Sequence, residues 1–219
     1  MIQFDHVCVT ARDKLILSDI NFTLNQGDKA VLCGKSGSGK STLLKTLLGL
    51  YEVHSGSISC LGKPLTAASL HVIRSCAAYI GQEPMLGADE VRAALLLPFK
   101  FKAHRGRLPS EPEINQVLQR LQLPTSILKQ ACRHISGGEK QRIALARGLL
   151  LGKQLFLLDE VTSALDEECK QAVIQVFTDP QLTVLSISHD ALWLEHSDLV
   201  YELKAGQLSQ IKANEYTRY

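Results

Sequence analysis

Nine consecutive residues have the types and the spacing of a phosphate-binding loop. The glycines of this segment let the backbone turn tightly enough for successive N–H groups to point at an anion. Its lysine is expected to reach the β- and γ-phosphates of a nucleotide, and the serine after it to ligate Mg²⁺. An ordinary Gly/Ser-rich turn is the alternative. The segment matches G-x-x-x-x-G-K-[ST] and consists of Gly34, Lys35, Ser36, Gly37, Ser38, Gly39, Lys40, Ser41 and Thr42.

The residues on both sides supply the strand and the helix that such a loop requires. Residues 29–33 form a short, mostly apolar run, which is typical of a buried parallel strand. Residues 40–50 carry four leucines at helical spacing. A helix that starts at the loop adds the partial positive charge of its N-terminus. This context favours a phosphate site over a turn.

Two carboxylates follow a second buried strand. Residues 155–158 are all apolar, and Asp159 and Glu160 come directly after them. Ligands bind at the carboxyl ends of strands in open α/β sheets. Asp159 is therefore expected to hold Mg²⁺, directly or through water, and Glu160 to act as the general base that polarises the attacking water. The alternative, a strand that merely ends in acidic residues, is weak beside a phosphate-binding loop.

A third segment has two interpretations. Residues 135–141 (ISGGEKQ) precede a helical run at 142–150, and Ser136 and Glu139 have the S-x-x-E spacing of a capping box. A well-capped helix is one interpretation. The other is a second anion nest, made by the Ser136 hydroxyl and the backbone amides of the two following glycines.

At this segment the sequence resembles the ABC-type ATPases. The run ISGGEKQRIALARG is similar to their LSGGQ signature, with Ile135 for the usual Leu and Glu139 for the usual Gln. The resemblance implies ATP hydrolysis, with ATP and Mg²⁺ as cofactors. It also implies a second ATPase subunit, taken to be a copy of this chain. The signature of one subunit would then complete the nucleotide site of the other in trans. The signature residues are Ser136, Gly137, Gly138 and Glu139.

The resemblance assigns three further groups of residues. Gln82, after a strand at 76–80, matches the glutamine that senses Mg²⁺ and water, and His189 matches the histidine that contacts the γ-phosphate. The implied catalytic residues are therefore Glu160, His189 and Gln82, and the implied Mg²⁺ ligands are Ser41, Gln82 and Asp159. The loop that crosses the dimer interface is matched by Ser163, Ala164, Leu165 and Asp166.

One part of the sequence departs from the family. ABC ATPases usually stack adenine on an aromatic residue in an early loop, and residues 7–12 contain none. Val9 is the residue that aligns best and is the expected ATP contact there. The preference for ATP over GTP is left open.

The order of the predicted elements indicates an α/β fold. The expected architecture is a P-loop NTPase (RecA-like) core with an antiparallel β subdomain and an inserted α-helical subdomain. Alternating residues predict antiparallel strands at 1–9 and 15–24, and residues 54–56 read as a turn before another strand. Leucine-rich helical periodicity places the helical subdomain at about 85–150. The whole chain, 1–219, is then a single ABC ATPase domain.

Composition limits the partners. The chain of 219 residues is 45% hydrophobic and carries a net charge of +2 with no dominant Lys/Arg cluster, so no nucleic-acid partner is expected. No apolar run approaches the roughly 18 residues that span a bilayer. Six scattered cysteines and the lack of a signal peptide indicate a cytoplasmic chain. Following the family, we expect it to lie on the inner face of the cell membrane, against an integral membrane permease subunit.

Within the family, residues 95–100, 123–128 and 159–167 most resemble small bacterial subunits assigned to iron export. Met85, Leu86 and residues 95–99 are expected to contact the permease, with a place in the helical core as the alternative. The alternative function is that of a non-transport ABC ATPase, which would act on ribosomes, DNA or iron–sulfur assembly. A kinase or GTPase is disfavoured by the signature. The transported solute, its direction, and whether the two ATPase subunits are copies of one chain stay open.

Overall fold

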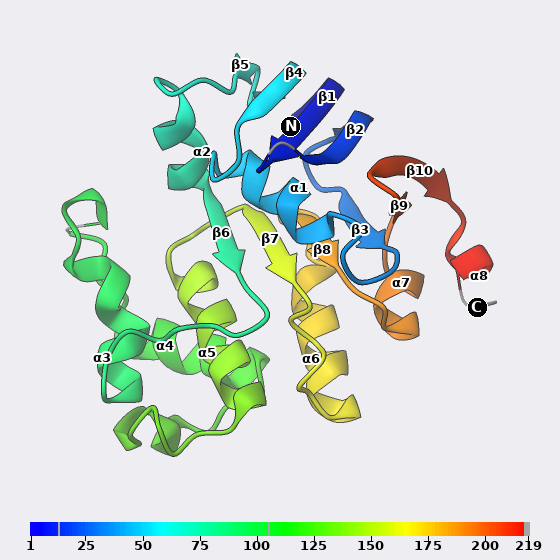
Figure 1. The fold of residues 1–219 in the computed structure, drawn as a ribbon. Coiled ribbons are helices and arrows are strands. Elements are labelled where there is room, and N and C mark those ends of the chain that lie inside the picture. The colour runs from blue at the N-terminus through cyan, green and yellow to red at the C-terminus, as the bar shows by residue number, and fades with distance from the viewer. Residues whose placement is uncertain (13, 105, 217–219) are drawn as a thin grey trace.

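Two β-sheets frame the structure, a computed structural model that describes residues 1–12, 14–104 and 106–216 (Figure 1). The first sheet is antiparallel, with four strands in the order β2-β1-β4-β5. The second has six strands in the order β10-β9-β3-β8-β7-β6 and is parallel from β9 to β6. The strands are β1 (Ile2–Ala11), β2 (Lys14–Leu24), β3 (Lys29–Cys33), β4 (Val53–Cys60), β5 (Lys63–Pro64), β6 (Ala77–Ile80), β7 (Leu155–Asp159), β8 (Thr183–Ile187), β9 (Leu199–Lys204) and β10 (Gln207–Ile211).

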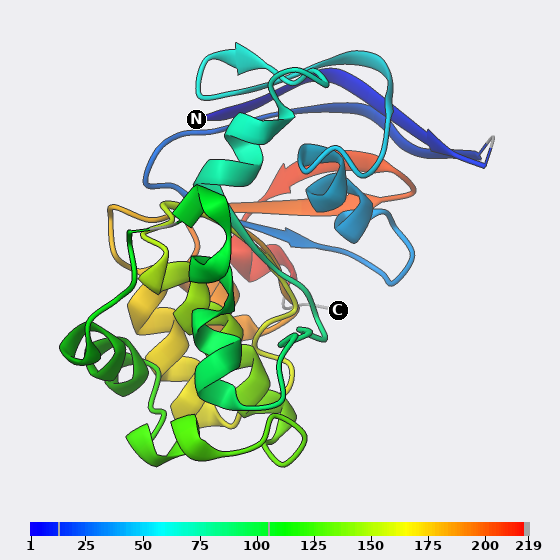
Figure 2. The ribbon, with the colours of Figure 1, turned by 90° about the vertical axis from the view of Figure 1, so that its left-hand side faces the viewer.

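Helices cover both faces of the six-stranded sheet. Helix α1 lies between the two sheets, and α5, α6 and α7 lie on the opposite side (Figure 1, Figure 2). The helices are α1 (Lys40–Leu47), α2 (Leu70–Cys76), α3 (Val91–Leu96), η1 (Leu97–Lys100), η2 (Lys102–His104), α4 (Glu111–Arg120), η3 (Thr125–Lys129), α5 (Gly137–Leu150), α6 (Glu167–Phe177), α7 (Ala191–Glu195) and α8 (Ala213–Tyr216).

Two apolar cores follow from the alternation of side chains along the strands. In β3, Ala30 and Leu32 face α1 and the antiparallel sheet, whereas Val31 and Cys33 face the helical side. All four are fully buried, which explains why the sequence of β3 is a continuous apolar run. With both faces covered, the carboxyl edge of the sheet is where loops are free to build a site.

Most of the predicted strands are confirmed. The prediction at 29–33 matches β3 residue for residue, and the predicted strands at 76–80 and 155–158 correspond to β6 and β7. The antiparallel strands at the N-terminus are also present. All the elements that the structure describes between β6 and β7 are helices, as a helical subdomain at 85–150 requires. That these residues form a separate subdomain stays a prediction.

One local prediction is wrong, and three short helices were not predicted. Residues 54–56 lie inside β4, where Gly56 adopts a φ of +81° and packs against the backbone of His6, so this glycine marks an irregular strand and not a turn. The helices α2, α7 and α8 have seven, five and four residues, which is too short for a periodic signal in the sequence.

Candidate nucleotide site

The loop between β3 and α1 has the geometry of an anion-binding loop. Gly34 has a φ of +128°, and a Cβ there would lie 2.2 Å from the carbonyl oxygen of Leu203, so that position requires glycine. Gly39 caps α1 with a φ of +107°. The hydroxyl oxygen of Ser38 is buried and has no hydrogen-bond partner among the described residues. This hydroxyl and the free N–H groups of the first turn of α1 are therefore available to an anion.

Lys40 lies inside this loop. Its side chain is 6% exposed, and its Nζ donates to the carbonyl oxygens of Gly34 at 2.6 Å and Lys35 at 3.1 Å. Burial lowers the pKa of the ammonium, whereas the carboxylates of Glu160 and Asp159 act to raise it. Both hydrogen-bond partners of the ammonium are neutral, so a phosphate group would give it the charged partner that they do not.

The other loop residues differ in exposure. Ser41 and Thr42 begin α1 and are half-buried. Lys35, Ser36 and Gly37 are exposed at the surface of the loop. The serine that is predicted to ligate Mg²⁺ is thus on the inner, helix side of the loop.

Asp159 ends β7 at the carboxyl edge of the parallel sheet. It is 6% exposed, and the phenol of Tyr79 on β6 donates to its Oδ2 at 3.4 Å. Burial, together with the nearby Asp159 carboxylate, raises the pKa of Tyr79 to about 12, so the phenol keeps its proton. No sequence pattern pointed to Tyr79, since an aromatic residue in a buried strand is typical of the core.

Glu160 is held in an unusual backbone conformation. Its φ is +52°, a value that residues other than glycine rarely adopt. Its N–H donates to the carbonyl of Ile187 at 3.0 Å, and Ser163 donates to its carbonyl through both N–H and Oγ. The side-chain amide of Gln82 donates to Glu160 Oε2 at 3.0 Å. Two of the predicted catalytic residues, 78 positions apart, are therefore in direct contact.

His189 follows β8 at the same edge of the sheet. Although the residue is exposed on one side, desolvation lowers the pKa of its imidazole below the usual 6.5, and the positive charge of Lys40 lowers it further. Glu160 opposes this shift. The structure thus brings His189 into one electrostatic environment with Lys40 and Glu160. Its contact with the γ-phosphate stays a prediction. Its imidazole also contacts Tyr216 of α8, which sequence reasoning missed.

The predicted signature forms the N-terminus of α5. Ser136 Oγ accepts from the N–H of Glu139 at 3.2 Å, and the Glu139 carboxylate accepts from the N–H of Ser136 at 2.7 Å. The capping box is confirmed. The amides of the two glycines remain at the helix start, so the second interpretation, an anion nest, stays a prediction.

The signature and the phosphate-binding loop of one chain do not meet. No hydrogen bond or ion pair joins residues 34–42 to residues 136–139, all of which the structure describes. In both views the start of α5 lies at the lower end of the molecule, away from the loop before α1 (Figure 1, Figure 2).

The match to a known family extends beyond these motifs. The model of the family described as ABC transporter matches residues 17–163. This chain belongs to the ABC transporter family. It is an ABC ATPase, and the resemblance seen in the sequence is confirmed.

Individual relatives cover nearly the whole chain. The ABC ATPase is 35% identical to the "Probable iron export ATP-binding protein FetA" of Escherichia coli (strain K12), over 97% of this chain and 96% of FetA. It is 33% identical to the mitochondrial iron–sulfur clusters transporter ATM1 of Candida albicans over 90% of this chain, which spans 27% of that protein.

Solved structures confirm the α/β, P-loop NTPase fold. A bacterial Atm1-family ABC exporter with ATP bound has a TM-score of 0.87 and 26% identity, covering 99% of this chain and 40% of that chain. A dimeric ATP-binding cassette in a post-hydrolysis state bound to ADP and Pi has a TM-score of 0.85 and 24% identity, covering 97% and 99%. At that identity the second likeness concerns the fold alone. Among the described residues, no helix has the length and apolarity needed to cross a membrane.

Two predicted contacts of the ABC ATPase are corrected by burial. Val9 is fully buried in the core under the antiparallel sheet, because the alternation in β1 turns it inward, so its side chain does not offer a surface to adenine. Leu86 and Leu95, predicted to face a permease, are 6% exposed or less and belong to the helical core. Phe99, predicted to do the same, is also 6% exposed. Met85 is 90% exposed and remains available to a partner.

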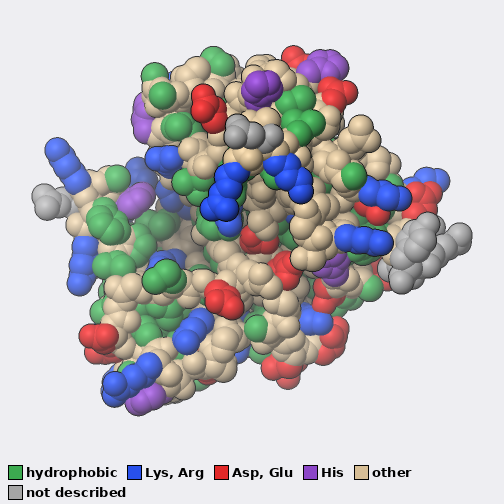
Figure 3. Space-filling view, viewed as in Figure 1, with side chains coloured by type: hydrophobic (Ala, Val, Ile, Leu, Met, Phe, Trp, Pro, Cys, Tyr) green, Lys and Arg blue, Asp and Glu red, His purple; other side chains and the backbone are tan. Residues whose placement is uncertain are grey.

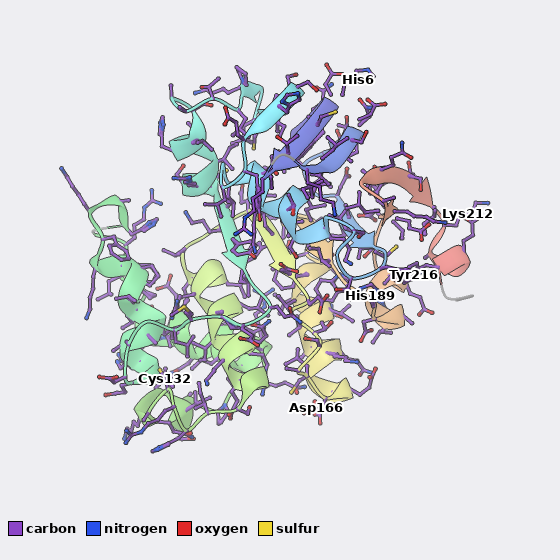
Figure 4. All side chains as sticks on the ribbon, viewed as in Figure 1. His6, Cys132, Asp166, His189, Lys212 and Tyr216 are labelled. Carbon is purple, nitrogen blue, oxygen red and sulfur yellow. The ribbon has the colours of Figure 1, made fainter. Side chains whose placement is uncertain are left out.

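The signature of this ABC ATPase packs tightly against the loop at 163–166. A Cβ added to Gly138 would lie 2.8 Å from the carbonyl oxygen of Ala164 and 3.1 Å from Cδ2 of Leu165. Asp166 in turn caps α6 by accepting from the N–H of Cys169 at 2.8 Å (Figure 4). A substitution at Gly138 must therefore move the backbone of this loop.

We expect Gly138→Ala to lower ATPase activity by about tenfold or more, because a shift of both segments misplaces groups that act at the transition state. Gly137→Ala is the matched comparison, since its Cβ would meet Ala164 Cβ at an ordinary 3.8 Å. The measurement is the steady-state rate of phosphate release, with thermal unfolding to check folding. A loss at Gly137 that equals or exceeds the loss at Gly138 would contradict this packing argument.

Proposed function

We propose that this ABC ATPase drives the export of a solute, with iron as the candidate, through a separate integral membrane permease on the inner face of the cell membrane. The observation that carries the proposal is the end-to-end alignment with the E. coli protein named for probable iron export. Among the described residues, no group of three or more His, Cys, Asp or Glu side chains could hold a metal ion. We therefore assign recognition of the solute to the permease.

We propose a head-to-tail dimer of two copies as the active unit. In one chain the start of α5 is remote from the phosphate-binding loop, so a second copy is needed to bring Ser136 and the amides of Gly137 and Gly138 to the nucleotide. The loop at 163–166 packs on Gly138 and would cross the same interface. Residues 85–150 would move as a helical subdomain that carries the signature.

The donor atoms near the loop fit Mg²⁺. Ser41, Asp159 and Gln82 offer hydroxyl, carboxylate and amide oxygens, which are the hard ligands that Mg²⁺ prefers. Mg²⁺ bound together with ATP would neutralise negative charge on the β- and γ-phosphates. Tyr79 would orient Asp159 through its hydrogen bond.

Hydrolysis would follow from the contacts at the edge of the sheet. Lys40 and the amides of the loop would bind the phosphates of ATP, including the γ-phosphate that leaves. Glu160 would accept a proton from the attacking water, and Gln82, hydrogen-bonded to Glu160, would fix its carboxylate. His189 would donate to the γ-phosphate. Loss of that phosphate removes a charge that both copies bind, so the dimer would open.

The permease would contact the hollow beside Met85. This hollow of about 400 Å³ is lined by β6, the segment after it and α5. Hydrophobic side chains gather on the left of the face shown in Figure 3, over the helical segments between β6 and β7. A cytoplasmic helix of the permease with an apolar face is the occupant that we propose.

The test is purification of tagged full-length chain from detergent-solubilised membranes of its native host. We expect an integral membrane protein to co-purify, and the reconstituted pair to hydrolyse ATP faster with ferrous iron than with magnesium alone. Met85→Glu is expected to reduce the co-purified protein about tenfold, an effect of the size seen for a single central contact. Leu50→Glu is the matched control, because Leu50 is 62% exposed in the turn after α1. Association with ribosomes or DNA instead would reject the transport proposal.

A further inference from the structure

Helix α8 contacts the site through one side chain. Tyr216 Oη lies 2.6 Å from Nδ1 of His189, and the two rings have centroids 6.0 Å apart (Figure 4). The two residues are 27 positions apart, and α8 follows the hairpin β9–β10 in the chain. The partner of the histidine is therefore set by the C-terminal segment of this chain.

The surroundings of the Tyr216 oxygen decide which atom supplies the proton. Tyr216 is half-buried, and burial raises the pKa of its phenol, so the hydroxyl keeps its proton. A protonated phenol can direct its O–H at the imidazole nitrogen that lies 2.6 Å away.

The protonation of His189 makes the direction of this hydrogen bond matter. Its pKa lies below 6.5, so the imidazole is neutral at pH 7 and carries a single N–H. If Nδ1 held that proton, Nε2 would present a lone pair, which repels a phosphate. If Nδ1 accepts from Tyr216, the proton is on Nε2, which can donate.

We propose that Tyr216 is a positioning residue for ATP hydrolysis: its hydroxyl donates to Nδ1 of His189 and holds the imidazole in the Nε2–H tautomer that donates to the γ-phosphate. This inference rests on the role proposed above for His189.

The tautomer is tested without any activity measurement. The full chain is labelled with ¹⁵N-histidine, and long-range ¹H–¹⁵N correlations are recorded at about pH 8, where an imidazole of this kind is neutral. The chain has seven histidines, so the spectrum of His189→Asn identifies the resonances of His189. We expect the Nε2–H pattern in the wild type and a shift toward a mixture in Tyr216→Phe. An Nδ1–H pattern in the wild type, or no change in the variant, would overturn the proposal.

Kinetics then test the consequence of the contact. We expect Tyr216→Phe to lower kcat about fivefold, the loss that corresponds to one hydrogen bond of ordinary strength, with little change in KM. Tyr51→Phe is the matched control, since Tyr51 is half-buried and its hydroxyl has no partner among the described residues. In a His189→Ala background, Tyr216→Phe is expected to change kcat less than about twofold, because the two residues act as a unit.

Two outcomes separate this proposal from the proposed function. Equal losses from Tyr216→Phe in both backgrounds would show that the phenol acts elsewhere, and would overturn the positioning role while leaving His189 in place. Full activity in His189→Ala would remove the assigned role of His189, and with it the catalytic part of this inference.

Discussion

Replacement of Glu160 by glutamine is expected to lower the ATPase kcat by about 10²- to 10⁴-fold, the range in which a general base contributes. The amide of glutamine cannot accept a proton from the attacking water. ATP binding should survive, because Lys40 and the amides of the loop are unchanged. We expect the variant to accumulate as an ATP-bound dimer, since the γ-phosphate that joins the two copies is not removed. Light scattering with and without ATP measures that dimer.

The substitution is conservative for the fold. Glutamine has the shape of glutamate, and the backbone contacts that hold residue 160 at a φ of +52° involve its N–H and carbonyl, not its side chain. The hydrogen bond from Gln82 to Oε2 can be kept by the amide oxygen of glutamine. Loss of activity would therefore report on chemistry and not on unfolding.

The matched control is Glu52→Gln, the same chemical change on an exposed residue beyond the far end of α1. It is expected to retain the wild-type rate. A Glu160→Gln variant that turns over at the wild-type rate would remove Glu160 as the base, and the role would then have to pass to another group near the γ-phosphate.

The backbone conformation of Glu160 also explains why the adjacent carboxylates of Asp159 and Glu160 make different contacts. Asp159 ends β7 in extended backbone, and its side chain is held by Tyr79. The left-handed turn at the next residue directs the Glu160 carboxylate to Gln82 instead. Strain of this kind persists where the surroundings determine the conformation, as the hydrogen bonds to Ile187 and Ser163 do here.

The central part of the site could be predicted because its signals are local. The strand at 29–33 is buried on both faces and is therefore a continuous apolar run, and the loop that follows has a fixed pattern of glycines. Strands of a parallel sheet end at one edge, so residues that follow different strands meet there. That rule and the resemblance to ABC-type ATPases together predicted that Glu160, Gln82 and His189 lie at one edge of the sheet.

The rest of the site depends on contacts that no local pattern encodes. Tyr79 reads as a core residue of a strand, and Tyr216 reads as one polar terminal residue among others, yet their hydroxyls contact Asp159 and His189. The prediction that Val9 contacts ATP was wrong for a related reason. Alignment alone could choose the position, but bulges in the pairing of β1 decide which of its side chains face the core.

Two variants that are each inactive should restore activity when they are mixed. Lys40→Ala removes the ammonium of the phosphate-binding loop but leaves the signature intact. Ser136→Arg blocks the signature but leaves the loop intact. If each nucleotide lies between the loop of one copy and the signature of the other, a mixed dimer contains one intact site and one site with both defects.

The expected rate of an equal mixture is about a quarter of the wild-type rate, since half of randomly paired dimers are mixed and each has one working site of two. The measurement is phosphate release after exchange of the two variants, with different affinity tags to count mixed dimers. The geometry favours recovery, because within one chain no hydrogen bond or ion pair joins residues 34–42 to the described residues 136–139. If mixed dimers form and remain inactive, the site is either completed within one chain or needs both sites intact. Recovery would instead mean that Lys40 and Ser136 of different copies act on the same ATP, so that the loop between β3 and α1 is half of a catalytic site.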